Sequence, residues 1–153
     1  MQPIILILGP TAGGKTSLAI SLAHALEGGG ECICADSMQI YRGMDIGTAK
    51  PTQEEQEQAV HHLVDIVDPC DDGFTVETWL KLAEQTIEDI RKRGKWPIVV
   101  GGTNLYVQSL LFGMFDGPKC DQNKRDTLSA IANTTLQDRL RTLDPEAADR
   151  IHI

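Results

Sequence analysis

The sequence has few aromatic residues, no long apolar run and no cysteine pattern typical of a metal site. Aromatic residues make up 5% of the 153 residues, against 41% hydrophobic residues overall, so the chain can build a core of modest size. No stretch approaches the roughly 18 apolar residues of a membrane span. The apolar segment near the N-terminus is too short for a signal peptide, and no cleavage-like site follows it. These absences favour a soluble, cytoplasmic protein of about one domain with no membrane partner.

Only two of the four cysteines are close in sequence. Cys32 and Cys34 form a C-x-C pattern inside an apolar run, whereas Cys70 and Cys120 stand alone. Zinc sites usually combine two close pairs, and no second pair exists here. We therefore expect reduced, buried thiols rather than a zinc site.

Acidic residues outnumber basic residues by 22 to 14, which gives a formal net charge of −8. This balance argues against a nucleic-acid partner, because phosphate contacts need lysine and arginine. Basic residues nevertheless gather locally, notably over 91–95 and 119–125. The first of these groups is most simply a helix end stabilised by cations. Composition alone therefore does not indicate RNA.

Apolar runs separated by turn signals predict an α/β fold. Continuous runs at 3–8, 32–35 and 98–100 are typical of buried parallel strands. An amphipathic pattern, with Thr75 as candidate N-cap, predicts a helix over 76–90. The opening strand, helix and strand imply a parallel sheet with a right-handed crossover. We expect a P-loop NTPase-like parallel sheet flanked by helices.

Shorter elements are expected in the connections. Thr52 and Glu55 are spaced as a capping box, which predicts a short helix beginning there. Another short apolar run covers 63–67, and a helix begins near Asn104. Asp144-Pro145 has the pattern of an N-cap followed by proline at the first helical position.

The composition of the chain changes after about residue 115. Gly117-Pro118 has the composition of a linker, and the residues beyond it are polar, with narrow apolar stripes at helical spacing. We expect a P-loop catalytic core over 1–116, incomplete without further sequence, and the beginning of a small helical insertion over 117–153. The abrupt end at Ile153 indicates a fragment.

The clearest motif is a phosphate-binding loop between the first strand and the following helix. It fits the pattern G-x4-G-K-[ST] and comprises Gly9, Pro10, Thr11, Ala12, Gly13, Gly14, Lys15 and Thr16. Glycines let backbone N–H groups turn toward an anionic phosphate, and the helix N-terminus adds partial positive charge. Lys15 would neutralise the terminal phosphate oxygens, and the Thr16 hydroxyl would ligate Mg²⁺. This context favours a di- or triphosphate ligand such as a nucleotide over an ordinary glycine turn.

A single acid follows the second predicted strand. Asp36 lies at the carboxyl edge of the sheet, where ligands bind in open α/β folds. A carboxylate there could ligate Mg²⁺ through water or act as a base. The alternative is a turn-forming role. Kinases also place an acid at this point, so Asp36 alone does not separate phosphoryl transfer from other chemistry.

Longer runs carry a resemblance to one family. They are GPTAGGKT at 9–16, DSMQIYRGMDIGTAKP at 36–51, HHLVDIVDP at 61–69 and VGGTNLY at 100–106. Together they closely resemble the tRNA dimethylallyltransferases. The similarity weakens after residue 116 and returns in DPEAADRIH at 144–152. The run at 36–51 is the most specific, because it is long.

The resemblance implies a reaction and its partners. Dimethylallyl diphosphate would lose pyrophosphate while the exocyclic amine of an adenine, just 3′ of the tRNA anticodon, attacks the allylic carbon. The loop amides, Lys15 and Mg²⁺ would stabilise the leaving pyrophosphate. By resemblance, Asp36 is the base that takes the amine proton, and Thr103 hydrogen-bonds near the same amine. An adenine inside the folded anticodon stem-loop is out of reach, so we expect it to be flipped out.

The resemblance also implies contacts with tRNA. The residues matching the family's tRNA-contacting stretch, and its tRNA-contacting arginine, are Asp36, Ser37, Met38, Gln39 and Arg125. The family usually has serine in place of Gly13, so one hydroxyl contact is expected to be lost. The family also continues well beyond Ile153, which leaves the activity of the chain alone in question. A monomer is expected.

Three other functions stay open. A small-molecule or nucleotide kinase would use Asp36 as base and Arg139 or Arg141 as lid residues, but would leave the runs at 36–51 and 100–106 unexplained. An adenylate isopentenyltransferase would perform similar chemistry on a free nucleotide. A chain that only binds phosphate or RNA is the third.

Other conspicuous residues have simple interpretations. His61 and His62 are adjacent and point apart, and neither has a partner at ligand spacing, so we expect structural roles. Trp79 and Trp96 are expected to pack in the core or against helices rather than to stack on bases.

Overall fold

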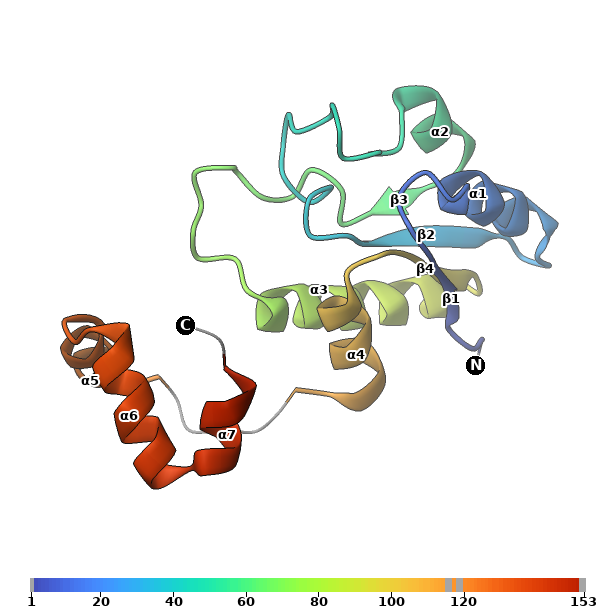
Figure 1. Cartoon of the computed structure of the whole chain (residues 1–153). Helices are drawn as coiled ribbons and strands as arrows, with labels where there is room; N and C mark the ends of the chain where they lie inside the picture. Colours follow the sequence, from blue (N-terminus) through green and yellow to red (C-terminus); the bar gives the residue numbers. More distant parts are fainter. Residues whose placement is uncertain (1, 115–116, 118–119, 152–153) are drawn as a thin grey trace. The chain divides into compact units, whose positions relative to one another are not determined.

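The computed structural model describes residues 2–114, 117 and 120–151. Within these residues, the strands β1 (Ile5–Leu8), β2 (Gly30–Ala35), β3 (His61–His62) and β4 (Trp96–Gly101) form one parallel sheet. The order across the sheet is β1-β4-β2-β3, so the last strand in sequence lies between the first two (Figure 1). The predicted α/β class with a parallel sheet is confirmed.

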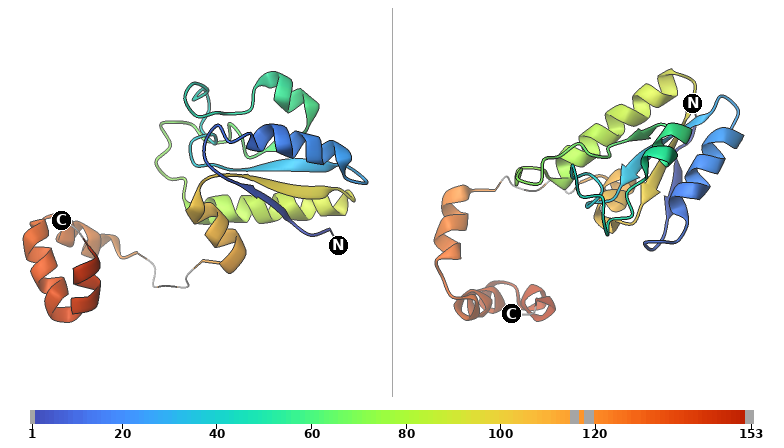
Figure 2. Two further views of the ribbon diagram at one scale, coloured as in Figure 1. Left: turned by 45° about the vertical axis from the view of Figure 1, so that its right-hand side comes forward. Right: turned by 90° about the horizontal axis from the view of Figure 1, so that it is seen from above.

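Helices cover both faces of this sheet. The helix α1 (Lys15–Ala25) packs on one face against β2 and β4, with α2 (Gln53–Gln58) beside it. The helices α3 (Val76–Lys92) and α4 (Asn104–Phe112) cover the opposite face, as Figures 1 and 2 show. The flanking helices predicted from the sequence are therefore present on both sides.

The strands share a register that ends three of them in one row. Leu8 of β1 pairs with Gly101 of β4, and Gly101 pairs in turn with Ala35 of β2. Because the strands are parallel, the segments that follow β1, β4 and β2 all leave the sheet at the same edge. This edge is where the candidate site lies.

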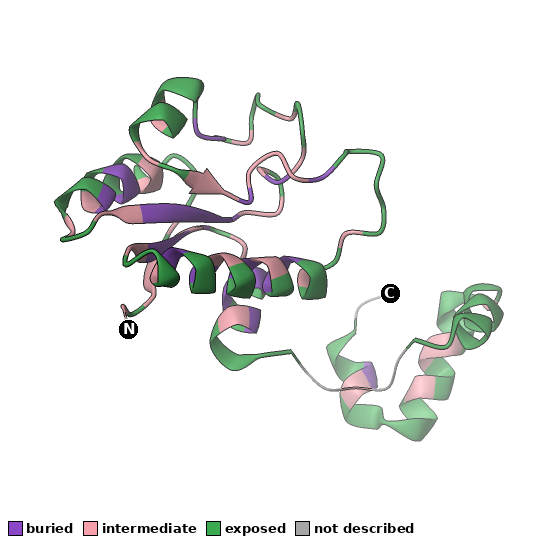
Figure 3. Cartoon of the chain, turned by 180° about the vertical axis from the view of Figure 1, so that it is seen from behind, coloured by how far each residue is buried: buried purple, intermediate pink, exposed green. Residues whose placement is uncertain are grey.

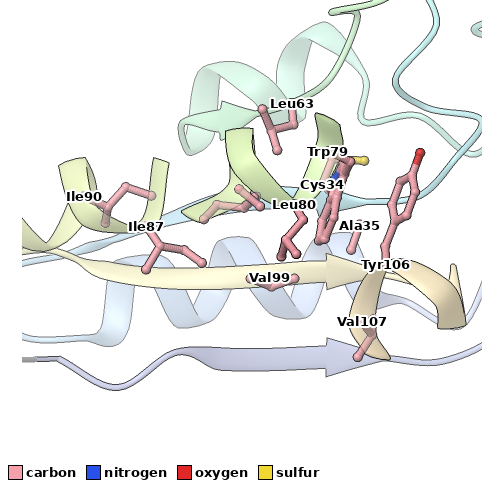
Figure 4. Close-up of a cluster of buried hydrophobic side chains, with 12 residues drawn as sticks. Cys34, Ala35, Leu63, Trp79, Leu80, Ile87, Ile90, Val99, Tyr106 and Val107 are labelled. Atoms are coloured by element: carbon pink, nitrogen blue, oxygen red, sulfur yellow. Dashed lines mark hydrogen bonds between the residues drawn. The ribbon is translucent and has the colours of Figure 1, made fainter. Parts of the chain in front are cut away.

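The larger cluster of buried hydrophobic residues lies between the sheet and the helices α3 and α4. Strand β2 is buried along most of its length (Figure 3). The Trp79 ring is fully buried and stacks on Tyr106, with ring centroids 4.4 Å apart, while its indole N–H donates to the Cys34 carbonyl at 3.0 Å (Figure 4). Burial raises the pKa of Tyr106 to about 12. The predicted packing role is confirmed for Trp79, and Trp96 is half-buried with its indole N–H on the Glu27 carbonyl.

Three of the strands follow predicted apolar runs, whereas β3 (His61–His62) was not predicted and the run at 63–67 forms no strand. Strands β1, β2 and β4 overlap the predicted runs, and β2 and β4 begin two residues earlier than expected. The apolar run at 63–67 forms no strand, because Leu63 and Asp65 adopt positive φ values of 61° and 56° that a strand does not allow. Only Val67 in this run forms a bridge, to Tyr41.

The predicted helix starts are built by side-chain caps. Thr52 and Glu55 form both hydrogen bonds of the capping box at α2. Thr75 accepts from the Thr78 N–H at the start of α3. These starts are confirmed.

Contacts divide the chain into two units, Met1–Met114 and Phe115–Ile153. The described part of the second unit contains α5 (Gln122–Ser129), α6 (Asn133–Leu143) and α7 (Pro145–Arg150). Asp144 caps α7 as predicted, by accepting from the Ala147 N–H at 3.0 Å. Residue 116, Pro118 of the predicted linker and Lys119 of the basic group lie outside the described residues, so the division at 116/117 stays a prediction.

No helix in the described part of the chain combines the length and apolar character that a bilayer crossing needs.

The cysteines differ in burial. Cys32 and Cys34 are buried free thiols, and burial raises their pKa values to about 11 and about 12. Cys70 and Cys120 are exposed, so the expectation of buried thiols is wrong for these two. Both cysteines lie in loops rather than in strands, which explains their exposure to solvent. Among the described residues, no group of three His, Cys, Asp or Glu side chains could hold a metal ion.

A buried carboxylate at the start of β2 binds three cationic or ionisable side chains. Glu31, with its side chain 2% exposed, accepts from Arg93, from Lys95 at 2.8 Å and from His62 at 2.7 Å. The hydrogen bonds from Arg93 outweigh the effect of burial and, with Lys95 and His62, hold the pKa of the Glu31 carboxyl well below its usual range. This confirms a structural role for His62. The basic group at 91–95 is thus only partly a helix end, since Arg93 and Lys95 neutralise Glu31.

Replacing Glu31 by glutamine should lower the free energy of unfolding near pH 7 by about 2 kcal/mol, because hydrogen bonds to a charged group are lost or weakened. In the wild type the folded-state pKa lies below the reference value of 4.5. The stabilisation is therefore complete above that pH and is lost as pH falls below it, where the unfolded chain takes up the proton first. Thermal unfolding measured from pH 7 downward should give a steeper fall of Tm below about pH 4.5 in the wild type than in Glu31→Gln.

The exposed Glu88 on α3 provides a matched control. Glu88→Gln should change the free energy of unfolding by no more than about 0.5 kcal/mol. Equal slopes of Tm against pH for wild type and Glu31→Gln would contradict the assignment of Glu31 as the group that is linked to acid stability.

Candidate functional site

Three segments meet at the edge where the strands end. The phosphate-binding loop (residues 9–16) follows β1, Asp36 follows β2, and Gly102 and Thr103 follow β4. The shared register of β1, β4 and β2 places these segments side by side. The sequence predicted each segment, and the sheet brings them together.

The phosphate-binding loop has the backbone shape that its glycines allow. Gly14 is the N-cap of α1 with φ 74°, a left-handed conformation that favours glycine, and no side chain caps the helix. The first N–H groups of α1 therefore need other partners. The Gly13 N–H and the Lys15 ammonium both donate to the Pro10 carbonyl, at 3.2 and 2.7 Å. An anion at this helix start would find both backbone donors and a lysine.

A cavity of about 330 Å³ opens at this edge. The predicted site residues that line it are Thr11, Ala12, Gly13, Gly14, Lys15, Thr16, Asp36 and Gln39. Other residues on its wall are Ser17, Thr48, Ala49, Lys50, Glu55, Val100 and Gly101. The predicted residues that do not line it are Gly9, Pro10, Ser37, Met38 and Thr103.

Thr103 holds the turn that presents Asp36. Its hydroxyl oxygen accepts from the Ser37 N–H at 2.9 Å and lies 3.2 Å from the Ser37 hydroxyl, while its own N–H donates to the Ala35 carbonyl. The Asp36 carboxylate accepts from the Met38 N–H at 2.9 Å. Asp36 therefore forms a turn and also lines the cavity. Its role as a base or as a ligand of Mg²⁺ stays a prediction. The Thr103 contact with an amine stays a prediction.

The segment 36–51, called here the acid loop, forms one wall of the cavity. The Gln39 side-chain amide donates to the carbonyls of Thr48 and Ala49, at 3.1 and 3.0 Å. The Arg42 guanidinium donates to the Asp65 carbonyl at 2.9 Å. These bonds fold the acid loop back on itself and against the segment that follows β3.

Lys50 is the buried cation of this wall. Its ammonium donates to the Tyr41 carbonyl at 2.7 Å, to Asp45 at 2.8 Å and to Asp65. Burial alone would lower the pKa of Lys50, but the hydrogen bonds to Asp45 and Asp65 outweigh it and raise that pKa above its ordinary value. The sequence did not predict the partners of Lys50, because Tyr41 and Asp45 lie elsewhere in the acid loop and Asp65 lies on the segment that follows β3.

Two further predicted tRNA-contacting residues, Met38 and Arg125, belong to different units. Met38 is 45% exposed at the turn after Asp36. Arg125 is an exposed residue of α5, in the second unit. Their contacts with RNA stay predictions.

Gly101 is a glycine because β4 and β2 approach closely at the site. A Cβ added there would lie 2.1 Å from the Ala35 carbonyl oxygen. At Gly13, a Cβ would lie 3.0 Å from the Pro10 carbonyl oxygen, so a serine at this position needs a small shift of that carbonyl. Glycine at 13 leaves the Pro10 carbonyl where the Lys15 ammonium meets it.

Comparison with known proteins gives matches over nearly the whole chain. The family model described as IPP transferase matches residues 39–153, and the model described as isopentenyl transferase matches residues 2–74. A tRNA dimethylallyltransferase 2 of Geotalea uraniireducens is 48% identical over 153 residues, which cover 97% of this chain and 48% of that protein.

Two solved structures are similar to this one. A tRNA isopentenylpyrophosphate transferase of Bacillus halodurans matches with a TM-score of 0.71 and 43% identity, over 99% of this chain and 51% of that chain. A eukaryotic dimethylallyltransferase acting on tRNA matches with a TM-score of 0.82 and 34% identity, over 99% of this chain and 38% of that chain. The chain spans about half the length of the curated relatives it matches.

Replacing Gly101 by alanine should lower the free energy of unfolding by about 3 kcal/mol, because the new methyl group meets backbone that cannot move aside. Urea unfolding of both proteins measures the change. Gly9→Ala is the matched control, since a Cβ at Gly9 meets only the Lys15 side chain at 3.9 Å. If the two alanine variants were equally stable, the close approach of β4 to β2 would not be what requires glycine at 101.

Proposed function

The chain belongs to the IPP transferase family, and we propose that it transfers a dimethylallyl group from dimethylallyl diphosphate to the exocyclic amine of a tRNA adenosine. The observation that carries the proposal is one cavity lined by the phosphate-binding loop, by Lys15 and by Asp36. In this cavity the loop and Lys15 can bind a diphosphate, and Asp36 can take the proton that the nucleophile must lose. The acceptor is the adenosine 3′-adjacent to the anticodon, in the anticodon stem-loop. A cytoplasmic location and a monomeric state belong to the same proposal.

The loop residues serve the leaving group. As the allylic C–O bond breaks, negative charge develops on the pyrophosphate oxygens. The Lys15 ammonium, which donates to the Pro10 carbonyl, can turn to these oxygens, and the N–H groups at the start of α1, which no side chain caps, can donate to the same oxygens. The loop thus stabilises the charge that the reaction creates.

A divalent cation fits the same wall. The Thr16 hydroxyl and the Asp36 carboxylate both line the cavity, and oxygen ligands of these kinds suit Mg²⁺. Thr16 would hold the ion directly and Asp36 through water. When bound, Mg²⁺ would add positive charge beside the pyrophosphate oxygens.

Asp36 serves the acceptor. As the C–N bond forms, the exocyclic amine becomes cationic and must give up a proton, which the Asp36 carboxylate accepts. Thr103 and Met38 hold the backbone around this carboxylate. An adenine reaches it only when flipped out of the anticodon loop, against the stretch Asp36 to Gln39.

Replacing Asp36 by asparagine should lower prenyl transfer by about 10²-fold or more, because the group that takes the proton is removed. The measurement is transfer of labelled dimethylallyl diphosphate to an unmodified anticodon stem-loop with Mg²⁺. Asp72→Asn, an exposed loop residue, is the control and should keep wild-type transfer. Phosphorylation of a small molecule at the expense of ATP, without transfer to RNA, would instead favour a kinase. Transfer to AMP in preference to the stem-loop would favour a free-nucleotide acceptor.

Replacing Lys15 by methionine should weaken the binding of inorganic pyrophosphate by about tenfold or more, because charge-assisted hydrogen bonds to the phosphate oxygens are lost. Titration calorimetry of the chain with pyrophosphate and Mg²⁺ gives the two dissociation constants. Lys81→Met, an exposed lysine on α3, is the control and should leave binding unchanged. Equal affinities of wild type and Lys15→Met for pyrophosphate would contradict a role of Lys15 in phosphate binding.

A further inference from the structure

The acid loop is long and yet fixed in place. Residues 36–51, all of them described, contain neither a helix nor a strand, only the bridge from Tyr41 to Val67. Loops of this length without secondary structure are usually mobile or functional. Here three backbone bonds hold the loop: Asp65 N–H to Gln39, Arg42 N–H to Val67, and Val67 N–H to Ile40. The loop therefore rests on the segment 63–67.

The Lys50 ammonium joins the parts of this structure. Its three acceptors come from the first half of the acid loop (Tyr41), from its tip (Asp45) and from the supporting segment (Asp65). An ammonium has three donors, so all of them are used. The side chain is 4% exposed, whereas Asp45 is 66% and Asp65 41% exposed. A lysine fixed in this way connects two surface carboxylates through the interior of the loop.

Backbone strain lies on both sides of this connection. Ala49, directly before Lys50, has φ 51°, and Asp65, one of its acceptors, has φ 56°. Left-handed conformations of residues other than glycine cost free energy and persist where surrounding contacts hold them. The hydrogen bonds of Lys50 and Gln39 are the contacts that hold this backbone.

The loop in turn fixes Gln39. Its amide nitrogen donates to the Thr48 and Ala49 carbonyls, and its side-chain oxygen accepts from the Cys34 thiol at 3.5 Å. Gln39, Thr48 and Ala49 all line the cavity. Asp36 has a separate support, because Thr103 and Met38 hold its turn. The phosphate-binding loop has a third, in the start of α1.

We propose that Lys50 is a positioning residue for the acceptor half of the site: it locks the acid loop on segment 63–67 and so fixes Gln39 and the wall of Thr48 and Ala49 against the acceptor base. The proposal rests on the proposed function for the identity of that base. Lys50 lines the same cavity as the loop 9–16, but its ammonium bonds to Tyr41, Asp45 and Asp65 and not to that loop, which builds the diphosphate half of the site. Loss of Lys50 therefore affects the acceptor and leaves the diphosphate bound.

Hydrogen exchange tests the lock without any need for activity. In Lys50→Met, the amides of Arg42, Asp65 and Val67 should exchange about tenfold faster or more, because the local opening that exposes them is easier. Amides of β4 should keep their protection, which shows that the variant is folded. Lys92→Met, an exposed lysine on α3, is the matched control and should leave the three amides unchanged. Unchanged exchange of these amides in a folded Lys50→Met variant would overturn the proposal.

A milder variant covers the case in which Lys50→Met does not fold. Asp45→Asn removes one charged partner from the tip of the loop and leaves Asp65 in place. It should speed the exchange of the same amides by a smaller factor, and no change at all would again overturn the proposal.

Binding separates a positioning role from a general loss of structure. The dissociation constant of an anticodon stem-loop should rise about tenfold or more in Lys50→Met, since misplacement of positioned groups is costly. The dissociation constant of pyrophosphate should stay within about twofold of the wild type. A parallel loss of both affinities would overturn the assignment of Lys50 to the acceptor half. A wild-type chain that binds AMP but no stem-loop would contradict the proposed tRNA acceptor, while the exchange measurement would still decide the role of Lys50.

Discussion

The site depends on the close contact between β4 and β2 at Gly101 and Ala35. The two strands can end in register only because no side chain stands between the Gly101 backbone and the Ala35 carbonyl. Leu8 of β1 pairs with the same glycine from the other side. One constraint of backbone packing thus aligns three strand ends, and with them the phosphate-binding loop, Asp36 and Thr103.

Beyond the sheet edge, the site is held by three independent devices of different chemistry. The phosphate-binding loop uses backbone conformation, with Gly14 in the left-handed region at the start of α1. The turn of Asp36 uses a side-chain hydroxyl, that of Thr103. The acid loop uses a buried charge, that of Lys50. Because they share few partners, changes in one device should add to changes in another rather than cancel them.

The sequence predicted the local parts of this arrangement well, because each has a local cause. The phosphate-binding loop, the capping box at Thr52 and the cap at Thr75 are set by residues within a few positions of each other. The order of the strands could not be predicted in the same way, since β4 enters between β1 and β2 from far along the chain. The partners of Lys50 and Glu31 were missed for the same reason. Glu31 is a charged residue at the start of an apolar strand, which marks it as unusual but does not identify the residues that neutralise it.

Of the two carboxylates at the ends of β2, one stabilises the fold and the other lines the candidate site. Glu31, at the start of the strand, is enclosed by Arg93, Lys95 and His62, and its pKa is held well below the usual range. A carboxylate held so firmly in its charged form cannot take a proton near neutral pH, so it can only stabilise. Asp36, directly after the same strand, faces a cavity and is held through backbone and hydroxyl groups instead. The proposed base is therefore the acid that faces the cavity, and β2 places it at the sheet edge where the phosphate-binding loop begins.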